Sequence, residues 1–117
     1  MDLLAGEIVQ RAYALNPAEL DATLRSLGLT NWLQATQNLS FQGWDTGGGC
    51  MMLTADLPGT GGHQIGITNG EADFPRDTEN FWVGVMDPDG DEVFYMFVNN
   101  GQLQNGAVHD ASHIDAV

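Results

Sequence analysis

The spacing of the apolar residues changes near Phe41, and this change constrains the fold more than any other feature of the chain. Before Phe41, Leu4, Ile8 and Leu15 recur at helical intervals, so one stripe of a helix faces a core. After Phe41 the period falls to two, as in strands. The strand-like runs are residues 50–57, 63–68, 81–86 and 92–98. The sequence therefore predicts helices first and an antiparallel sheet afterwards.

Capping residues predict where the later helices begin and end. Asn16 is a suitable cap, Pro17 suits the first helical position, and Glu19 can reach back to complete a capping box. Gly28 is a suitable stop for this second helix. A third, short helix is predicted from residue 30 or 31 to about residue 38.

Turn-forming residues separate the predicted strands. Residues 58–62 and 87–91 are rich in Gly, Pro and Asp and predict two hairpin turns. Residues 100–117 predict a polar tail that either adds one short strand or stays loosely ordered. At 117 residues the chain suits one domain. We expect an α+β fold in which two or three helices (1–40) pack on an antiparallel sheet of four or five strands (41–99).

The two later strands are apolar on both faces. Phe81, Val83 and Val85 alternate with Trp82, Gly84 and Met86, and the same holds along residues 93–98. A sheet with one face in water alternates with polar residues instead, so both faces need cover. The helices suit one face, while the far ends of the helices, a second copy or a target protein remain open for the other. The candidate contact residues are Trp82, Phe94 and Met96.

The formal net charge is −13, and all three cationic side chains are arginines. Direct nucleic-acid binding requires clustered Lys and Arg, so it is not expected. The same charge attracts a basic protein partner, although solubility or adaptation to salt explains it equally well.

Half of the acidic residues lie within 71–92, where only Arg76 opposes them. The two segments that carry them flank one strand at opposite ends, which predicts two acidic poles rather than a stripe. They are candidate contacts for a basic partner or simply a hydrated surface. These candidates are Glu71, Asp73, Asp77, Glu79, Asp87, Asp89, Asp91 and Glu92.

No catalytic signature is present. Cys50 invites interpretation as a nucleophile, but a hairpin that pairs residues 57 and 63 would hold His63 roughly 23 Å away at about 3.3 Å per residue. His109 and His113 have the spacing of a helical zinc pair without a matching third ligand. We therefore expect no enzyme, and a thiol or metal-dependent enzyme remains the least favoured alternative.

Two glycine- or acid-rich segments resemble ligand loops only in part. Gly47, Gly48 and Gly49 lack the Lys and the helix that follow a phosphate loop, so they predict a structural turn. The acids at 87, 89 and 91 have calcium-loop spacing, but Glu92 and Val98 stand where such a loop needs Gly and Glu. No cofactor and no metal are expected.

Three segments carry a resemblance to a known group of proteins: the glycine-rich turn from Trp44 to Cys50, the segment 65–70 and the hairpin from Val83 to Gly90. Over roughly residues 44–92, the chain resembles small uncharacterised acidic proteins of bacterial viruses. The resemblance implies no activity, cofactor or catalytic residue. It favours an accessory protein that binds a host factor.

The single cysteine excludes an internal disulfide, and the amino terminus shows neither an export signal nor a membrane segment. We expect a cytoplasmic protein, in the host cytoplasm if it is viral, that does not bind membranes. The predicted function is binding without catalysis: an acidic module, in its sharpest form a nucleic-acid mimic that inhibits a host nucleic-acid-binding factor. A self-assembling structural component, with a homodimer or larger oligomer, is the alternative.

Overall fold

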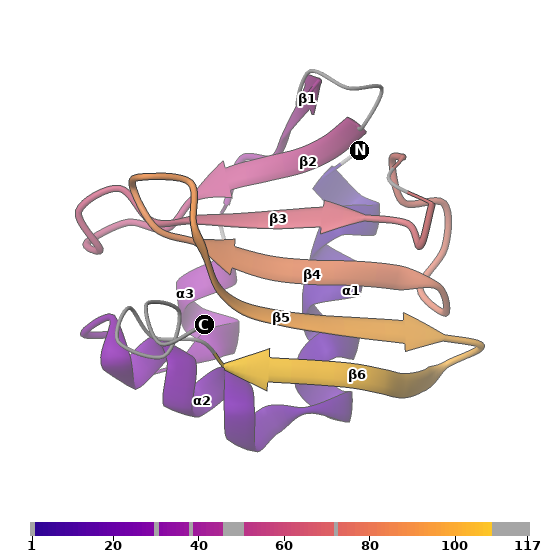
Figure 1. The fold of residues 1–117 in the computed structure, drawn as a ribbon, viewed down its shortest axis with the longest axis horizontal. Helices are drawn as coiled ribbons and strands as arrows, with labels where there is room; N and C mark the ends of the chain where they lie inside the picture. Colours follow the sequence, from indigo (N-terminus) through magenta and orange to yellow (C-terminus); the bar gives the residue numbers. More distant parts are fainter. Residues whose placement is uncertain (1, 30, 38, 46–50, 72, 109–117) are drawn as a thin grey trace.

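The computed structural model describes residues 2–29, 31–37, 39–45, 51–71 and 73–108. Within these residues, helices precede strands, as the change in period predicts (Figure 1). The helices are α1 (Asp2–Leu15), α2 (Pro17–Ser26) and α3 (Trp32–Thr36). The strands are β1 (Gln42–Asp45), β2 (Met51–Asp56), β3 (Gln64–Thr68), β4 (Phe81–Met86), β5 (Glu92–Asn99) and β6 (Gln102–Val108). The α+β class is confirmed.

The strands form one antiparallel sheet in the order in which they follow one another along the chain. The sheet has six strands, so the expected count of four or five is wrong. One added strand is β1, which pairs Trp44 with Met52. The other is β6, in the segment expected as a polar tail: Asn100 and Gly101 both have positive φ, which suits the two-residue turn that returns β6 along β5.

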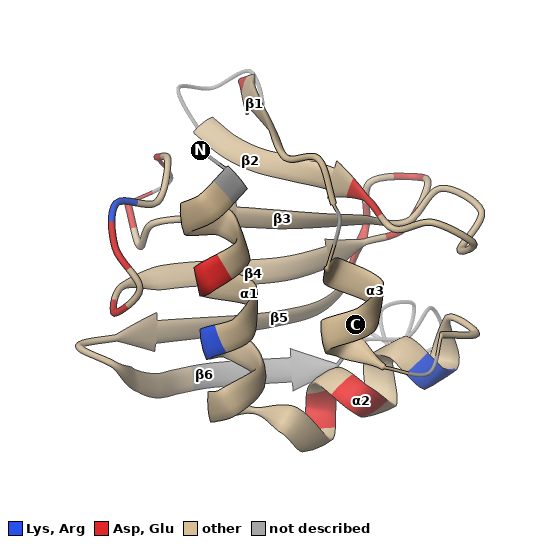
Figure 2. Ribbon diagram, turned by 180° about the vertical axis from the view of Figure 1, so that it is seen from behind, with Lys and Arg blue, Asp and Glu red and all other residues tan. Residues whose placement is uncertain are grey.

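All three helices lie on one face of the sheet (Figures 1 and 2). Their apolar stripes form the core together with alternate residues of the strands. Trp32 is fully buried there, and its indole N–H donates to the carbonyl oxygen of Val9 at 2.8 Å, which fastens α3 to α1. The main buried members are Ala5, Ile8, Val9, Ala12, Leu20, Leu24, Trp32, Ile65, Ile67, Phe81, Val83, Val85, Phe94, Met96 and Val98.

The ends of α2 match the sequence in part. Gly28 has a φ of +83° and its N–H donates to the carbonyl of Arg25, while the N–H of Leu29 donates to Leu24, which is the expected glycine stop. The predicted capping box is wrong. The N–H of Asn16 donates to Ala12 and continues the hydrogen bonding of α1, so it is not available to Glu19.

The short third helix is confirmed, with the side chain of Asn31 accepting a hydrogen bond from the backbone N–H of Gln34 at 2.9 Å. None of the helices in the described part of the chain combines the length and the apolar character needed to cross a membrane.

Candidate binding face

The second face of the sheet carries large apolar side chains that do not belong to the core cluster. Figure 1 views this face directly, and no described helix lies over it. Trp44 is 52% exposed, and the other members are partly exposed. We call this surface the open face and define it by Trp44, Met52, Trp82, Met86, Tyr95 and Phe97. The prediction that the helices cover one face is confirmed, whereas no described helix covers the other.

Strand register places Trp82 on the open face but not its two predicted companions. Trp82 pairs with Phe97, so these two side chains lie on the same face. Phe94 and Met96 alternate with Tyr95 and Phe97 and point into the core, where their exposure is 0%. They cannot contact a partner in this fold, which corrects their assignment as contact residues. Tyr95 and Phe97 take their place.

Two glycines lie side by side at the centre of the open face. Gly66 pairs directly with Gly84, and the gap that they leave is filled by longer side chains from neighbouring positions. The indole of Trp82 lies against Gly84, so closely that a Cβ at that position would collide with the ring. Met52 and Met86 reach over Gly66 in the same way. The glycines therefore allow large side chains to lie flat on the sheet.

The acidic residues of the segment 71–92 lie at the two ends of the open face. Figure 2 shows Asp and Glu residues in the β3–β4 loop and, at the opposite end of the strands, in the β4–β5 turn. The first pole comprises Glu71, Asp73, Asp77 and Glu79, and the second comprises Asp87, Asp89, Asp91 and Glu92. Asp56, the last residue of β2, pairs with Gln64, which in turn pairs with Met86, the residue before Asp87 of the second pole. The predicted separation into two poles is confirmed.

The second pole is a hydrogen-bonded hairpin turn. The carboxylate of Asp87 accepts the backbone N–H groups of Asp89 at 3.0 Å and Asp91 at 2.9 Å, and Gly90 takes a φ of +87°. Asp87 also pairs with Asp91 through the backbone. These contacts confirm the predicted turn, in which Asp89 and Asp91 are exposed.

The first pole is a longer loop whose own side chains hold its shape. The side-chain oxygen of Asn69 accepts the backbone N–H groups of Glu71 and Asp73, at 2.7 and 3.1 Å. Asp77 accepts the backbone N–H groups of Glu79 and Asn80, both at 2.8 Å. The N–H of Glu79 is the main cause of a lowered pKa for the Asp77 carboxyl, since it stabilises the charged form.

Contacts with two other elements fix this loop in place. Arg11 of α1 forms an ion pair with Glu79 at 3.2 Å, and the carbonyl of Glu79 accepts the N–H of Gly101. The side-chain oxygen of Asn80 accepts the N–H of Asn100 at 3.1 Å. The loop is therefore connected to both α1 and the β5–β6 turn.

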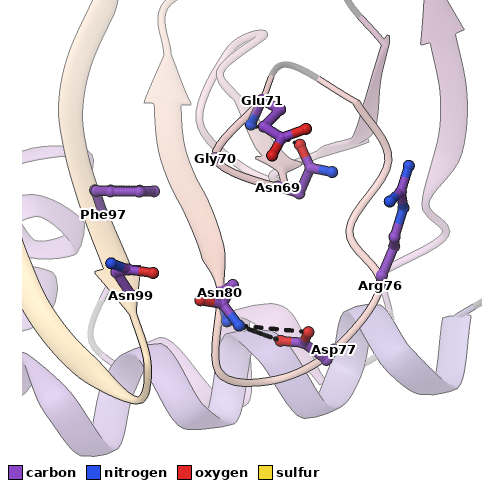
Figure 3. Close-up of a pocket in the computed structure, with 8 residues that line it drawn as sticks. All are labelled: Asn69, Gly70, Glu71, Arg76, Asp77, Asn80, Phe97 and Asn99. Atoms are coloured by element: carbon purple, nitrogen blue, oxygen red, sulfur yellow. Dashed lines mark hydrogen bonds between the residues drawn. The ribbon is translucent and has the colours of Figure 1, made fainter.

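A pocket of about 340 Å³ opens between this loop and β5 (Figure 3). We call it the loop pocket. Phe97 belongs to both the pocket and the open face, so the two surfaces are continuous. The lining residues are Asn69, Gly70, Glu71, Arg76, Asp77, Asn80, Phe97 and Asn99.

Several candidates that the sequence suggested lie outside the described residues: Gly47, Gly48, Gly49, Cys50, His109 and His113. His63 is described, and its Nδ1 lies 3.0 Å from the carbonyl oxygen of Thr60 in the β2–β3 turn. Among the residues that the structure describes, no three His, Cys, Asp or Glu side chains are grouped to hold a metal ion.

Comparison of the chain with protein-family models, with curated proteins and with solved structures found no match in any of the three.

Proposed function

We propose that this protein is a non-enzymatic binding module that docks a basic protein on its open face. The observation that carries the proposal is an apolar sheet face with an acidic pole at each end. Aromatic and methionine side chains are typical of the centre of protein interfaces, and charges at the rim steer and orient the partner.

Charge decides which occupant suits the open face best. The chain carries a formal net charge of −13, so two copies approaching face to face would bring acidic poles close together. A basic partner instead gains attraction at both poles while it buries the apolar centre. The occupant that we propose is therefore a protein with cationic groups around an apolar patch.

The narrower form of the proposal is an accessory protein of a bacterial virus that blocks the nucleic-acid-binding site of a host protein. The acidic charge supports it, since such sites are basic. The acids stand in two separated poles, so a basic groove would contact them at both ends and the open face between them. This contact differs from mimicry of a continuous phosphate row.

Self-assembly is the second candidate, favoured by the exposure of Trp44 and by the uncovered apolar area. Size exclusion with light scattering, across protein concentration at low and high salt, separates it from the first. We expect a monomer. A stable oligomer that strengthens at high salt, where repulsion between acids is screened, would favour self-assembly instead.

The proposal is tested by chemical crosslinking in host lysate, followed by titration of the purified captured protein. Trp44→Ser removes an exposed side chain of the open face, and Leu3→Ser is the matched control, because Leu3 is 77% exposed on α1. We expect a basic partner whose affinity falls about tenfold with Trp44→Ser and not with Leu3→Ser. Equal effects of both substitutions, or a partner insensitive to salt, would contradict docking on the open face.

A further inference from the structure

The loop pocket keeps uncompensated negative charge after its ion pairs are assigned. Arg76 lines the pocket but forms its ion pair with Asp73, at 3.3 Å. Arg11 is paired with Glu79. Neither pair includes Glu71 or Asp77, the two carboxylates that line the pocket. The pocket therefore favours a cation over an anion such as phosphate.

One aromatic residue, Phe97, forms part of the pocket wall. The ring of Phe97 packs directly on the backbone of Gly70, since a Cβ added there would lie only 2.9 Å from the ring. Phe97 also pairs with Trp82 across β4 and β5. An apolar path therefore runs from the open face into the pocket, along which the hydrocarbon part of a long basic side chain can lie.

Polar groups at the rim remain available to a ligand. Within the described residues, the side-chain amide of Asn99 makes no hydrogen bond, and the Nδ2 of Asn69 has no acceptor; both residues line the pocket (Figure 3). The amide oxygen of Asn99 can accept a donor from a ligand. The volume of about 340 Å³ is at the lower end of small-ligand sites, which span about 300–1,000 Å³.

We propose that the loop pocket receives the guanidinium group of an arginine from the basic partner. This inference rests on the proposed function, since it assumes that the partner is basic. A guanidinium is planar and stacks on an aromatic ring, and its several N–H donors can pair with carboxylate or amide oxygens of the lining, such as those of Glu71. A lysine ammonium offers neither the plane nor the fork, so arginine is preferred.

The test uses blocked single amino acids as probes, followed by ¹⁵N NMR of the intact protein. N-acetyl-arginine methylamide should shift the side-chain amide signals of Asn69, Asn80 and Asn99 and the backbone signal of Gly70. The lysine analogue should bind at least about threefold more weakly, and the neutral citrulline analogue should produce no shifts.

Two variants locate the site. Glu71→Gln should weaken arginine binding about three- to tenfold, and Phe97→Leu should weaken it about threefold. Glu7→Gln is the matched control, because it makes the same change in net charge at an exposed position on α1 and should leave the affinity unchanged. If Phe97→Leu disturbs the fold, as its own spectrum would show, Glu71→Gln in the exposed loop still decides the question.

If Glu71→Gln and Glu7→Gln weaken arginine binding equally, the proposal of an arginine site in the loop pocket is wrong and only a general effect of charge remains. Binding of citrulline as tightly as arginine, or shifts confined to the helical face, would overturn it as well. If blocked arginine fails to bind while Trp44→Ser still weakens the captured partner, the pocket inference alone is wrong. If Trp44→Ser has no effect on that partner, the proposed function itself is wrong.

Discussion

The two faces of the sheet use alternate residues of the same strands in different ways. On the helix-covered face, Val83, Val85 and Phe94 are fully buried. On the open face, large flexible or flat side chains cover two paired glycines, and no described helix completes the layer. The strand backbone is shared, so the difference lies in the side chains of each face and in what they pack against.

This contrast indicates what each face contributes. The side chains under the helices have lost almost all contact with water, so their contribution is to the stability of the fold. Those of the open face keep exposed area, and that area is still available for burial against a partner at about 25 cal/mol per Å². The first face stabilises the fold, and the second keeps the apolar area that we propose for recognition.

The strongest test of this contrast substitutes two phenylalanines of β5 that point to opposite faces. Phe94→Ala should lower the free energy of unfolding by about 3–5 kcal/mol, since it leaves a cavity in the core. Phe97→Ala should lower it by only about 1–2 kcal/mol, since that side chain is already partly exposed. Urea unfolding of both variants checks this, and equal losses would mean that the two faces are equally packed.

The paired glycines test how the open face is covered. Gly84→Ala should cost about 2 kcal/mol, because the new Cβ collides with the rigid indole of Trp82. Gly66→Ala should cost less than about 1 kcal/mol, because only the ends of Met52 and Met86 must move. Unfolding measurements, with the indole N–H signal of Trp82 as a local probe, compare them. A larger cost for Gly66→Ala would contradict this account.

The second pole tests the electrostatic part of recognition. Replacement of Asp87, Asp89 and Asp91 with Asn should weaken binding of the basic partner about tenfold at low salt, or about 1.4 kcal/mol, and flatten its salt dependence. The Asp87→Asn change keeps a side-chain oxygen to accept the turn N–H groups, so the melting temperature should change little. Titration at two salt concentrations measures the effect. Unchanged affinity at low salt would show that this pole makes no electrostatic contribution to binding.

The smallest effect concerns pH and the first pole. The pKa of Asp77 is lowered in the folded protein, so its carboxylate adds stability above its unfolded pKa of about 3.9 and loses that contribution as the pH falls through the folded value. The Asp77→Asn variant lacks this carboxyl, so its free energy of unfolding should fall slightly less than that of the wild type when the pH drops below about 4. Denaturant midpoints from pH 7 to 3 check this. Because Asp77 is exposed, the difference between the variant and the wild type should shrink in salt. If both proteins lose the same stability in acid, the prediction is wrong.

Much of the fold could be predicted from local patterns. The period change at Phe41, the glycine stop at residue 28 and the turn residues at 87–91 each correspond to observed structure. The capping box at Asn16 failed because the preceding helix already uses its N–H group, a contact that depends on how α1 ends. Strand β6 lies in the segment 100–117, for which a short strand was one of two predicted alternatives, whereas β1 was not predicted; pairing with β5 and with β2 makes each of them a strand.

The candidate site could be predicted only in outline. Two-sided apolar strands indicated that both faces need cover and left open what covers the second, and the positions of the acids indicated two poles. Phe94 and Met96 were assigned to the wrong face, and Tyr95 and Phe97 were overlooked, although strict alternation along β5 links them. The pocket residues Asn69 and Asn80 gave no sequence signal beyond that of an ordinary loop.

Residue type and spacing alone were enough to predict the order of helices and strands, the acidic charge and the apolar character of both sheet faces. Which apolar face the helices cover, and which residues meet across strands, became known only from the folded chain. Alternation divides a strand into two sets of side chains but does not say which set lies inside. That choice depends on the register between strands and on packing against α1, α2 and α3, which are contacts between residues far apart in the chain.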